Sequence, residues 1–327
     1  MAFTNAQAKP SSRFYHCQKA IGSIMMALLA GLVLLSSCRY QPGGERAEGQ
    51  KLKVLSTTGI IADAVSYIGG NRIVPSVLMG PGVDPHLYKA SQQDVSKLSD
   101  ANLIFYNGLH LEGKMGEVLH NLADHKPVVA LSDGIAPYRL RQIEGFENTY
   151  DPHIWFDVML WREAVLHIGQ TLAEQDTVNA DYYLGRTKTY CAELDSLDQW
   201  VRASWQSMPA ENRILVTAHD AFGYYGRAYG VEVRGLQGIS TQAEYGLQDL
   251  TSLVNFVVQR KLKSVFIETS VPQKAIDAVV AGCKSKGWQL NLGPSLYSDA
   301  LGEAGTPAGT YVGMVRANTN AIITALR

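Results

Sequence analysis

The sequence predicts an α/β protein with two lobes, each a mainly parallel sheet flanked by helices, joined by one long rigid spine helix. Segments with strand and helix character alternate between residues 51 and 131, which is typical of βαβ units and a parallel sheet. The alternation restarts after Pro209, and a proline-free segment with helical periodicity separates the two parts. The 289 residues after position 38 exceed what one hydrophobic core usually holds, which also favours two domains.

The first 38 residues have the pattern of an export signal. Three cationic residues precede a 16-residue apolar run at 20–35, and no acidic residue occurs before position 45. The run is short for a membrane span, and it ends in Leu-Ser-Ser-Cys38, which resembles a bacterial lipobox. We therefore expect a signal peptide over 1–38, acylation of Cys38, and a lipid-anchored protein in the periplasm or at the cell surface. An uncleaved signal anchor, or a chance cysteine after a signal peptide, is the alternative.

A tether and a first lobe follow the signal. Residues 39–50 consist largely of Gly, Pro, Glu and Gln, which is typical of a flexible tether. The first lobe, 51–178, is predicted to contain strands at 51–58, 72–79, 102–107 and 127–131, and helices at 60–68, at 91–98 and after His153. Ligands of parallel sheets bind beyond the carboxyl ends of the strands, and His86 lies in the loop after the second strand.

The longest periodic segment of the chain, 179–208, is predicted to be the helix between the lobes. Its large apolar residues share one face; they are Tyr190, Leu194, Leu197, Val201, Trp205 and Met208. An uninterrupted helix of this kind would be roughly 43 Å long, which is more than one small α/β domain needs. The alternative is an ordinary long helix on the surface.

The second lobe, 209–327, repeats the element order of the first lobe without repeating its residues. Strands are predicted at 213–218, 231–236, 264–268 and 288–293, and helices at 247–260, 275–286 and 310–327. His219 follows the first of these strands, and Asp299 lies in the loop after the last one. Two candidate ligands from each lobe would therefore meet in the cleft between the lobes.

Charge and cysteine content exclude several classes of protein. Removing residues 1–38 takes away three of the 29 Lys and Arg and none of the 30 Asp and Glu, so the mature chain is mildly acidic. Such a chain has no basic surface for nucleic acid, and we expect no nucleic-acid partner. Cys191 and Cys283 are too few for a disulfide scaffold or a cysteine-rich zinc site. They would either form one bridge in an oxidising compartment or remain two free, partly buried thiols.

Four residues are candidate metal ligands. His86 and His153 each follow an Asp-Pro pair, and the proline fixes the backbone from which the imidazole projects. His219 ends an apolar run, and Asp299 occupies a turn. Three imidazoles and one carboxylate are the number and kind of donors that a divalent transition metal requires.

Asp84 and Asp151 stand two residues before His86 and His153. Either carboxylate could orient the backbone or the imidazole of the histidine that follows it. The alternative is a purely structural role, in which the Asp-Pro pair starts a turn. Four other histidines of the mature chain have no motif context, and a lone histidine is more often structural than a ligand; they are His110, His120, His125 and His167.

Six motifs give the chain a resemblance to a known family. They are VDPHLY at 83–88, DPHIWFD at 151–157, TAHDAFGYY at 217–225, GLQGIST at 235–241, FIE at 266–268 and GTYVGM at 309–314. In this order they resemble the metal-binding receptors, or solute-binding lipoproteins, of zinc and manganese ABC importers, of the TroA-like type. The resemblance runs from about residue 50 to the C-terminus.

The resemblance implies a function and a ligand set. Two α/β lobes joined by one long helix would hold the metal in their cleft through His86, His153, His219 and Asp299. The receptor would capture a divalent metal as transported ligand and deliver it to an ABC permease and, through it, to the ATPase. We expect it to act as a monomer.

Two features bear on which metal is carried. Manganese-dedicated members of the family usually have Glu at the third ligand position, where this chain has His219, and three nitrogens with one carboxylate favour Zn²⁺ in intrinsic affinity. Zinc-dedicated members often carry a long His-rich loop, yet residues 112–150 hold only His120 and His125. We therefore predict zinc first, manganese (Mn²⁺) second and ferrous iron third.

Two functions of other classes compete with the receptor. A zinc hydrolase would be possible if Asp299 were a base and not a ligand, because four protein ligands leave no open metal position. Against it, neither His-Glu-x-x-His nor Gly-x-Ser-x-Gly occurs. We therefore expect no enzyme activity. A surface adhesin, a role reported for some relatives, has no sequence feature for or against it.

Overall fold

The computed structural model describes Ala2 and residues 50–143 and 148–327. The predicted signal peptide over 1–38, its Cys38, and the tether up to residue 49 lie outside the described residues. Gln50–Arg327 form one unit of the chain. Within the described ranges, no helix combines the length and the apolar character that crossing a membrane requires.

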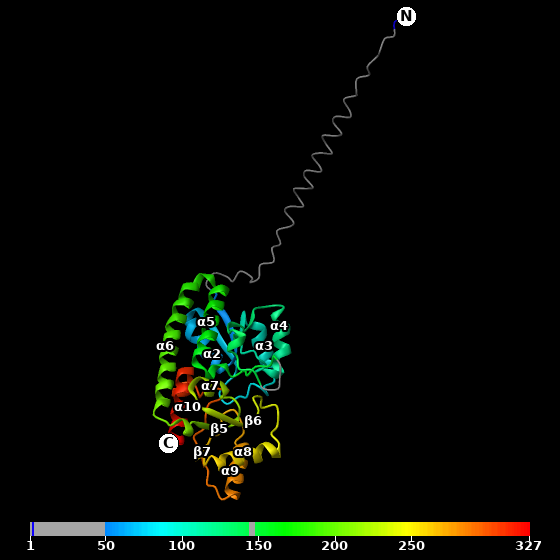
Figure 1. Ribbon diagram of the computed structural model, residues 1–327. Coiled ribbons are helices and arrows are strands. Elements are labelled where there is room, and N and C mark those ends of the chain that lie inside the picture. The colour runs from blue at the N-terminus through cyan, green and yellow to red at the C-terminus, as the bar shows by residue number, and fades with distance from the viewer. Residues whose placement is uncertain (1, 3–49, 144–147) are drawn as a thin grey trace. The chain divides into compact units, whose positions relative to one another are not determined.

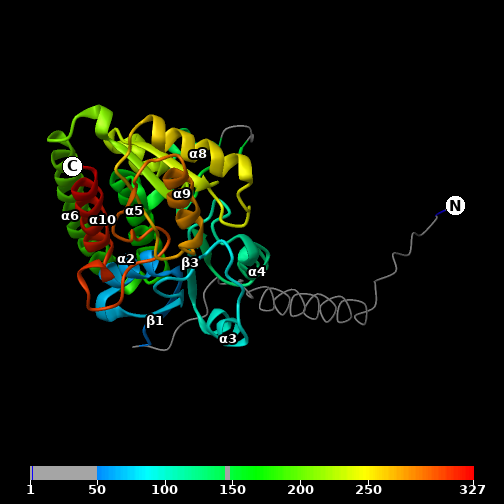
Figure 2. The ribbon, with the colours of Figure 1, turned by 90° about the horizontal axis from the view of Figure 1, so that it is seen from below.

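Four parallel strands form the sheet of the N-terminal half, in the spatial order β2-β1-β3-β4. The strands are β1 (Leu52–Thr58), β2 (Ile73–Met79), β3 (Leu103–Tyr106) and β4 (Val128–Ala130). The helices of this half are α2 (Gly59–Gly69), α3 (Gln92–Asp100), α4 (Gly116–Ala123) and α5 (Val158–Gln175). Alternate strand residues point to opposite faces: Val54 packs with α2 and α5, whereas Leu55 packs with α3 and α4. Helices therefore cover both faces of this sheet (Figure 2).

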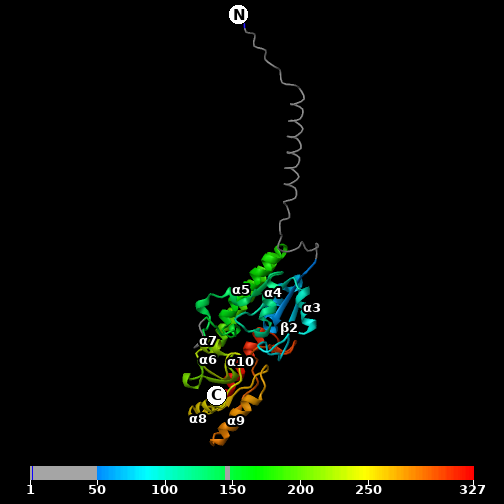
Figure 3. The same cartoon turned by 90° about the vertical axis from the view of Figure 1, so that its right-hand side faces the viewer.

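The C-terminal half contains two parallel strand pairs, β5 with β6 and β7 with β8. The strands are β5 (Ile214–His219), β6 (Glu232–Gln237), β7 (Ser264–Val265) and β8 (Asn291–Leu292), and the helices are α7 (Gly223–Tyr229), α8 (Leu247–Gln259) and α9 (Lys274–Ser285). The backbone N–H of Phe266 donates to the carbonyl of Val216 at 2.9 Å and so connects the two pairs. α8 and α9 lie at the end of the unit away from β2 and α3 (Figure 3).

Two helices connect the halves. The long helix α6 (Ala180–Gln206) and the closing helix α10 (Tyr311–Leu326) lie side by side, and α6 runs along both halves (Figures 1 and 2). α6 packs against α2 and α5 of the first half and against α7 of the second. Gly169 allows the close approach of α5, because a Cβ there would collide with Thr187 of α6.

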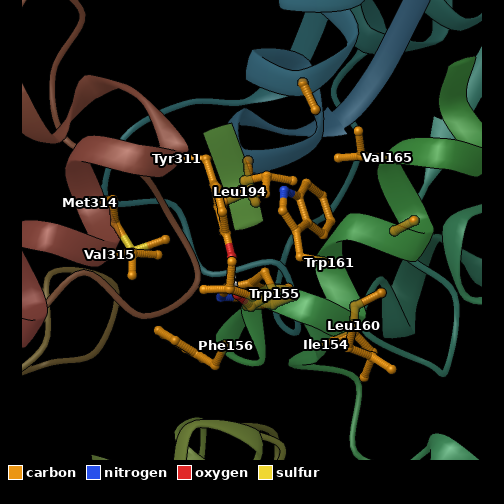
Figure 4. Close-up of a cluster of buried hydrophobic side chains, with 14 of the residues drawn as sticks. Ile154, Trp155, Phe156, Leu160, Trp161, Val165, Leu194, Tyr311, Met314 and Val315 are labelled. Carbon is orange, nitrogen blue, oxygen red and sulfur yellow. Dashed lines mark hydrogen bonds between the residues drawn. The ribbon is translucent and has the colours of Figure 1, made fainter. Parts of the chain in front are cut away.

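One hydrophobic core runs from the first sheet through α5 and α6 to α10. Figure 4 shows its aromatic centre, where Trp161 of α5 lies against Tyr311 of α10 with ring centroids 5.3 Å apart. The Tyr311 hydroxyl donates to the backbone carbonyl of Trp155 at 2.7 Å. This bond attaches the segment just after His153 to the closing helix, so the core of the protein supports the turn that carries that histidine.

Local sequence explains where several helices begin. The carboxylate of Asp157 accepts from the backbone N–H groups of Met159 and Leu160, which caps α5 a few residues after His153. Ser91 and Asp94 form a reciprocal capping box at the start of α3. At the start of α10, the hydroxyl of Thr310 caps the helix alone by accepting from the backbone N–H of Gly313.

The predicted fold class is confirmed, and most predicted elements lie within two residues of the observed ones. The strands expected at 264–268 and 288–293 were predicted too long, because β7 and β8 contain two residues each. The short helices α4 and α7 were not predicted. Cys191 and Cys283 are both free and buried, which decides between the two alternatives left open for them.

Candidate metal centre

The structure brings the four predicted ligand residues to one point between the two halves. His86 lies in the loop after β2, His153 precedes the short helix that leads into α5, His219 is the last residue of β5, and Asp299 lies in the loop after β8. One donor atom of each lies within 4.8 Å of the others. All four side chains are buried, with at most 1% of any of these residues exposed. Within residues 50–143 and 148–327, this is the one such group of candidate ligands.

The donor atoms face a common centre. The Nε2 atoms of His86 and His153 lie 3.4 Å apart. The two oxygens of Asp299 lie 3.4 Å from His153 Nε2 and 3.3 Å from His219 Nε2. The carboxylate therefore stands between two imidazoles, and the four donors surround a volume that suits a single ion.

His153 is held by the carboxylate predicted to orient it. Asp151 Oδ1 lies 2.7 Å from His153 Nδ1 and also accepts from the backbone N–H of His153 at 3.0 Å. This contact leaves Nε2 as the free donor and fixes the ring about its bond to the backbone. A carboxylate fully buried behind a histidine in this way is the usual support for a metal-binding imidazole.

His219 has an equivalent partner that the sequence analysis did not identify. Glu268 Oε2 lies 2.6 Å from His219 Nδ1, and Glu268 Oε1 accepts from the backbone N–H of His219 at 2.9 Å. Glu268 comes from the segment after β7. Its motif, FIE at 266–268, was noted for the resemblance, but nothing in the local pattern links it to a residue 49 positions earlier.

His86 differs from His153 and His219, because the contacts at this residue hold its backbone and not its imidazole ring. The carboxylate of Asp84 accepts from the backbone N–H of His86 at 2.8 Å and from the hydroxyl of Thr241 at 2.6 Å, so it supports the turn and not the ring. Among the described residues, no hydrogen-bond partner reaches the buried Nδ1 of His86. The backbone carbonyl of His86 accepts from the side chain of Gln242 at 2.8 Å. The His86 turn is therefore fixed through its backbone, partly by residues of the other half.

The carboxylates set the protonation of two imidazoles. Burial lowers the pKa of His153, but Asp151 and Asp299 outweigh burial and raise it to about 9. The same balance, with Glu268 and Asp299, raises the pKa of His219 well above its usual value. Burial dominates at His86 and lowers its pKa to about 3. Although burial alone would raise it, the neighbouring His219 and His153 hold the pKa of Asp299 well below its usual range.

This donor set fits a divalent transition metal. His219 Nε2 and Asp299 Oδ1 are buried without a hydrogen-bond partner among the described residues, which is costly unless an ion satisfies them. Three imidazole nitrogens and one carboxylate oxygen supply four donors for a metal ion from protein groups alone.

Comparison with known proteins agrees with this geometry. Residues 54–325 match the family described as zinc-uptake complex component A, periplasmic. The chain is 48% identical over 280 residues to the zinc-binding protein TroA of Treponema pallidum, covering 86% of this chain and 90% of that one. It is 45% identical over 304 residues to the manganese-binding lipoprotein MntA of Bacillus subtilis, covering 93% of this chain and 99% of that one.

Solved structures show the same fold. The periplasmic zinc-binding protein TroA of Treponema pallidum superposes with a TM-score of 0.83 at 47% identity, covering 85% of this chain and 99% of that one. The Fe(III)-bound YtgA of Chlamydia trachomatis gives a TM-score of 0.76 at 28% identity, covering 84% of this chain and 98% of that one. A two-lobed α/β fold that encloses three imidazoles and one carboxylate defines a class of metal-binding proteins. The chain belongs to the periplasmic zinc-uptake component A family.

Proposed function

We propose that this protein is the extracytoplasmic receptor of a metal-importing ABC transporter and that zinc is the ion it captures. The observation that carries the proposal is the buried cluster of His86, His153, His219 and Asp299, in which two imidazoles are held by carboxylates. These four residues are the proposed ligands, and Asp151 and Glu268 are the residues that orient two of them. The ion is the cargo, so a closed four-ligand cage serves binding and transfer and leaves no position for catalysis on a substrate.

Zinc is proposed first because zinc lies far above manganese in intrinsic affinity for nitrogen donors, and three of the four donors are imidazoles. Manganese is the second candidate. It is favoured by the manganese-binding lipoprotein MntA, which is similar to this chain over almost its whole length. The two relatives at 45% and 48% identity are named for different metals, so overall similarity does not choose between them. Ferrous iron is the third candidate.

The placement of the protein in the cell is part of the proposal. We propose that residues 1–38 direct export, that acylated Cys38 anchors the chain to a membrane, and that residues 39–50 are the tether. The two lobes are then 51–178 and 209–327, with 179–208 between them. The receptor acts as a monomer and passes the ion to a permease, which a cytoplasmic ATPase drives. Because each lobe supplies two ligands, separating the lobes removes half of the cage at once.

The experiment is a measurement of bound metal by mass spectrometry on the chain purified without chelator, followed by competition between Zn²⁺ and Mn²⁺. One zinc per chain that excess manganese does not displace is the expected result. Stoichiometric manganese retained under competition would change the assignment to a manganese receptor. A chain that binds neither metal would refute the four-ligand site.

A further inference from the structure

Arg141 pairs through its backbone with the start of the turn that carries His153. Its backbone carbonyl accepts from the N–H of Asp151 at 2.8 Å, and Gln142 and Tyr150 form an antiparallel bridge. The backbone position of Arg141 is therefore fixed relative to the turn that carries His153. Both residues belong to the N-terminal half.

The guanidinium of Arg141 joins two carboxylates that belong to different halves. Its Nη1 lies 2.8 Å from Asp151 Oδ2, and its Nη2 lies 3.2 Å from Asp220 Oδ2. Asp151 is the residue that orients His153, and Asp220 directly follows His219. One planar cation thus links the carboxylate that orients His153 to the residue that follows His219, across the boundary between the halves.

The C-terminal half is shaped to receive this side chain. A Cβ at Gly223 would collide with the Arg141 guanidinium, so glycine at the start of α7 makes room for it. The Tyr224 hydroxyl accepts from the backbone N–H of Arg141 at 2.9 Å and donates to the backbone carbonyl of Asp151 at 2.9 Å. Three nearby residues of the C-terminal half therefore accommodate one segment of the N-terminal half: Asp220 pairs with Arg141, Gly223 leaves room for its side chain, and Tyr224 bonds to its backbone.

The two ion pairs of Arg141 differ in how far they are exposed to water. Asp151 is fully buried, so its bond with Arg141 is shielded from water and lies within one half. The side chains of Arg141 and Asp220 are 33% and 22% exposed, so the bond across the boundary is only partly desolvated. Opening of the lobes would break the Arg141–Asp220 pair and leave the Arg141–Asp151 pair intact.

We infer that Arg141 is a positioning residue that latches the closed lobes through Asp220 and thereby sets how fast the metal leaves, without binding the metal itself. This inference rests on the proposed receptor function. Because the Arg141–Asp220 pair forms only when the lobes meet, its loss accelerates dissociation far more than it slows capture. The four-ligand cage itself stays the same.

The test measures the rate at which the chain releases zinc to an excess of chelator, by stopped flow. Asp220→Asn, which removes only the pair between the halves, is expected to accelerate release about tenfold. Arg141→Gln should accelerate it at least as much, because it also removes the pair with Asp151, and the double variant should release no faster than Arg141→Gln. Arg139→Gln is the matched control: this arginine lies two positions earlier and pairs with Glu163 inside the N-terminal half, so release should stay within about twofold of the unchanged chain.

A second measurement separates latching from damage to the site. The visible absorption spectrum of the Co²⁺-loaded chain reports the ligand set, and it should be the same in the unchanged chain and in Asp220→Asn, which leaves the Arg141–Asp151 pair in place. Release rates of Arg141→Gln and Asp220→Asn equal to that of Arg139→Gln, or effects that add in the double variant, would overturn the latch while leaving the receptor function in place. A chain that binds neither Zn²⁺ nor Co²⁺ before any substitution would overturn the receptor function and the latch with it.

Discussion

The two sides of the candidate metal centre are built in different ways. His153 and His219 each have a buried carboxylate behind the ring, Asp151 at 2.7 Å and Glu268 at 2.6 Å. His86 has no such partner among the described residues, and its turn is held through backbone contacts. The first two imidazoles are therefore fixed before a metal arrives, whereas His86 depends on how its loop is held.

The contacts between the lobes also differ on the two sides of the candidate metal centre. Behind His153, the two halves meet through a charged pair, Arg141 with Asp220. At the His86 turn they meet through neutral donors, Thr241 and Gln242 of the C-terminal half. The Thr241–Asp84 bond has one charged partner and the Gln242–His86 bond has none, whereas both partners of the Arg141–Asp220 pair are charged, so we expect the His86 side to loosen first when the lobes separate.

The largest effect on zinc affinity is expected from replacing Asp299, whose carboxylate lies between His153 and His219. Asp299→Ala removes the one anionic ligand that lies within 3.4 Å of both His153 and His219. Four-ligand zinc sites bind with about 10–16 kcal/mol, so one ligand contributes about 2.5–4 kcal/mol and its loss should weaken zinc binding about a hundredfold to a thousandfold. Competition with a chelator of known affinity measures the change. A variant that keeps stoichiometric, tight zinc would show that Asp299 is not a ligand.

The second largest effect is expected from pH, because the two histidines backed by carboxylates have a raised pKa and His86 has a lowered one. With its pKa raised to about 9, His153 is protonated at neutral pH in the metal-free chain, and so is His219, whose pKa is also raised. Coordination through Nε2 must expel these protons, so apparent affinity falls as pH falls, by about tenfold per pH unit for each proton released. His86, with a pKa lowered to about 3, releases none between pH 6 and 8.

Titration calorimetry of zinc binding in buffers of different ionisation enthalpy counts the protons released. We expect at least one proton per zinc at pH 7, and a loss of affinity of about a hundredfold or more between pH 8 and pH 6. Binding without proton release would show that the carboxylates do not keep the two imidazoles charged in the metal-free chain.

Several features of the fold and of the candidate metal centre could be predicted from the sequence, because they depend on residues close together in the chain. The Asp-Pro-His turns place His86 and His153, and the apolar stripe of α6 reveals the long helix without any partner in view. Asp151 stands two positions from the histidine it orients, so its role could be proposed from spacing alone. The ligand set itself was implied by the family resemblance.

The remaining features depend on contacts between distant segments. Glu268 supports a residue 49 positions earlier, Asp220 meets Arg141 across 79 positions, and Thr241 meets Asp84 across 157. No periodicity or motif spacing encodes such pairs, because they exist only after both halves have folded and met. The helix α7 was missed for a related reason: its two glycines lower helix propensity, and tertiary packing forms the helix nevertheless.

The third prediction tests the orienting carboxylates directly. Asp151→Asn and Glu268→Gln keep the shape of the side chain but remove the charge behind each ring, and we expect zinc affinity to fall about 10–100-fold. Asp84→Asn is the matched control on the other side, because Asp84 contacts a backbone N–H and Thr241 but no ring nitrogen, and it should lose less than about fivefold. Equal losses in all three variants would remove the distinction between the two sides of the centre.

The smallest expected effect concerns the Thr241–Asp84 contact at the His86 turn. Thr241→Val removes the hydroxyl that donates to Asp84 from the opposite half, with little change in shape. The Asp84 carboxylate is only part-buried and keeps the backbone N–H of His86 as a donor, so losing the hydroxyl should cost about 1 kcal/mol and accelerate zinc release about threefold to fivefold, less than the tenfold expected for Asp220→Asn. Thr251→Val in α8, whose hydroxyl donates only to the carbonyl of Leu247 within its own helix, should leave the rate unchanged. If Thr241→Val accelerates release more than Asp220→Asn does, the Thr241–Asp84 contact is the stronger of the two, and opening begins behind His153 instead of at His86.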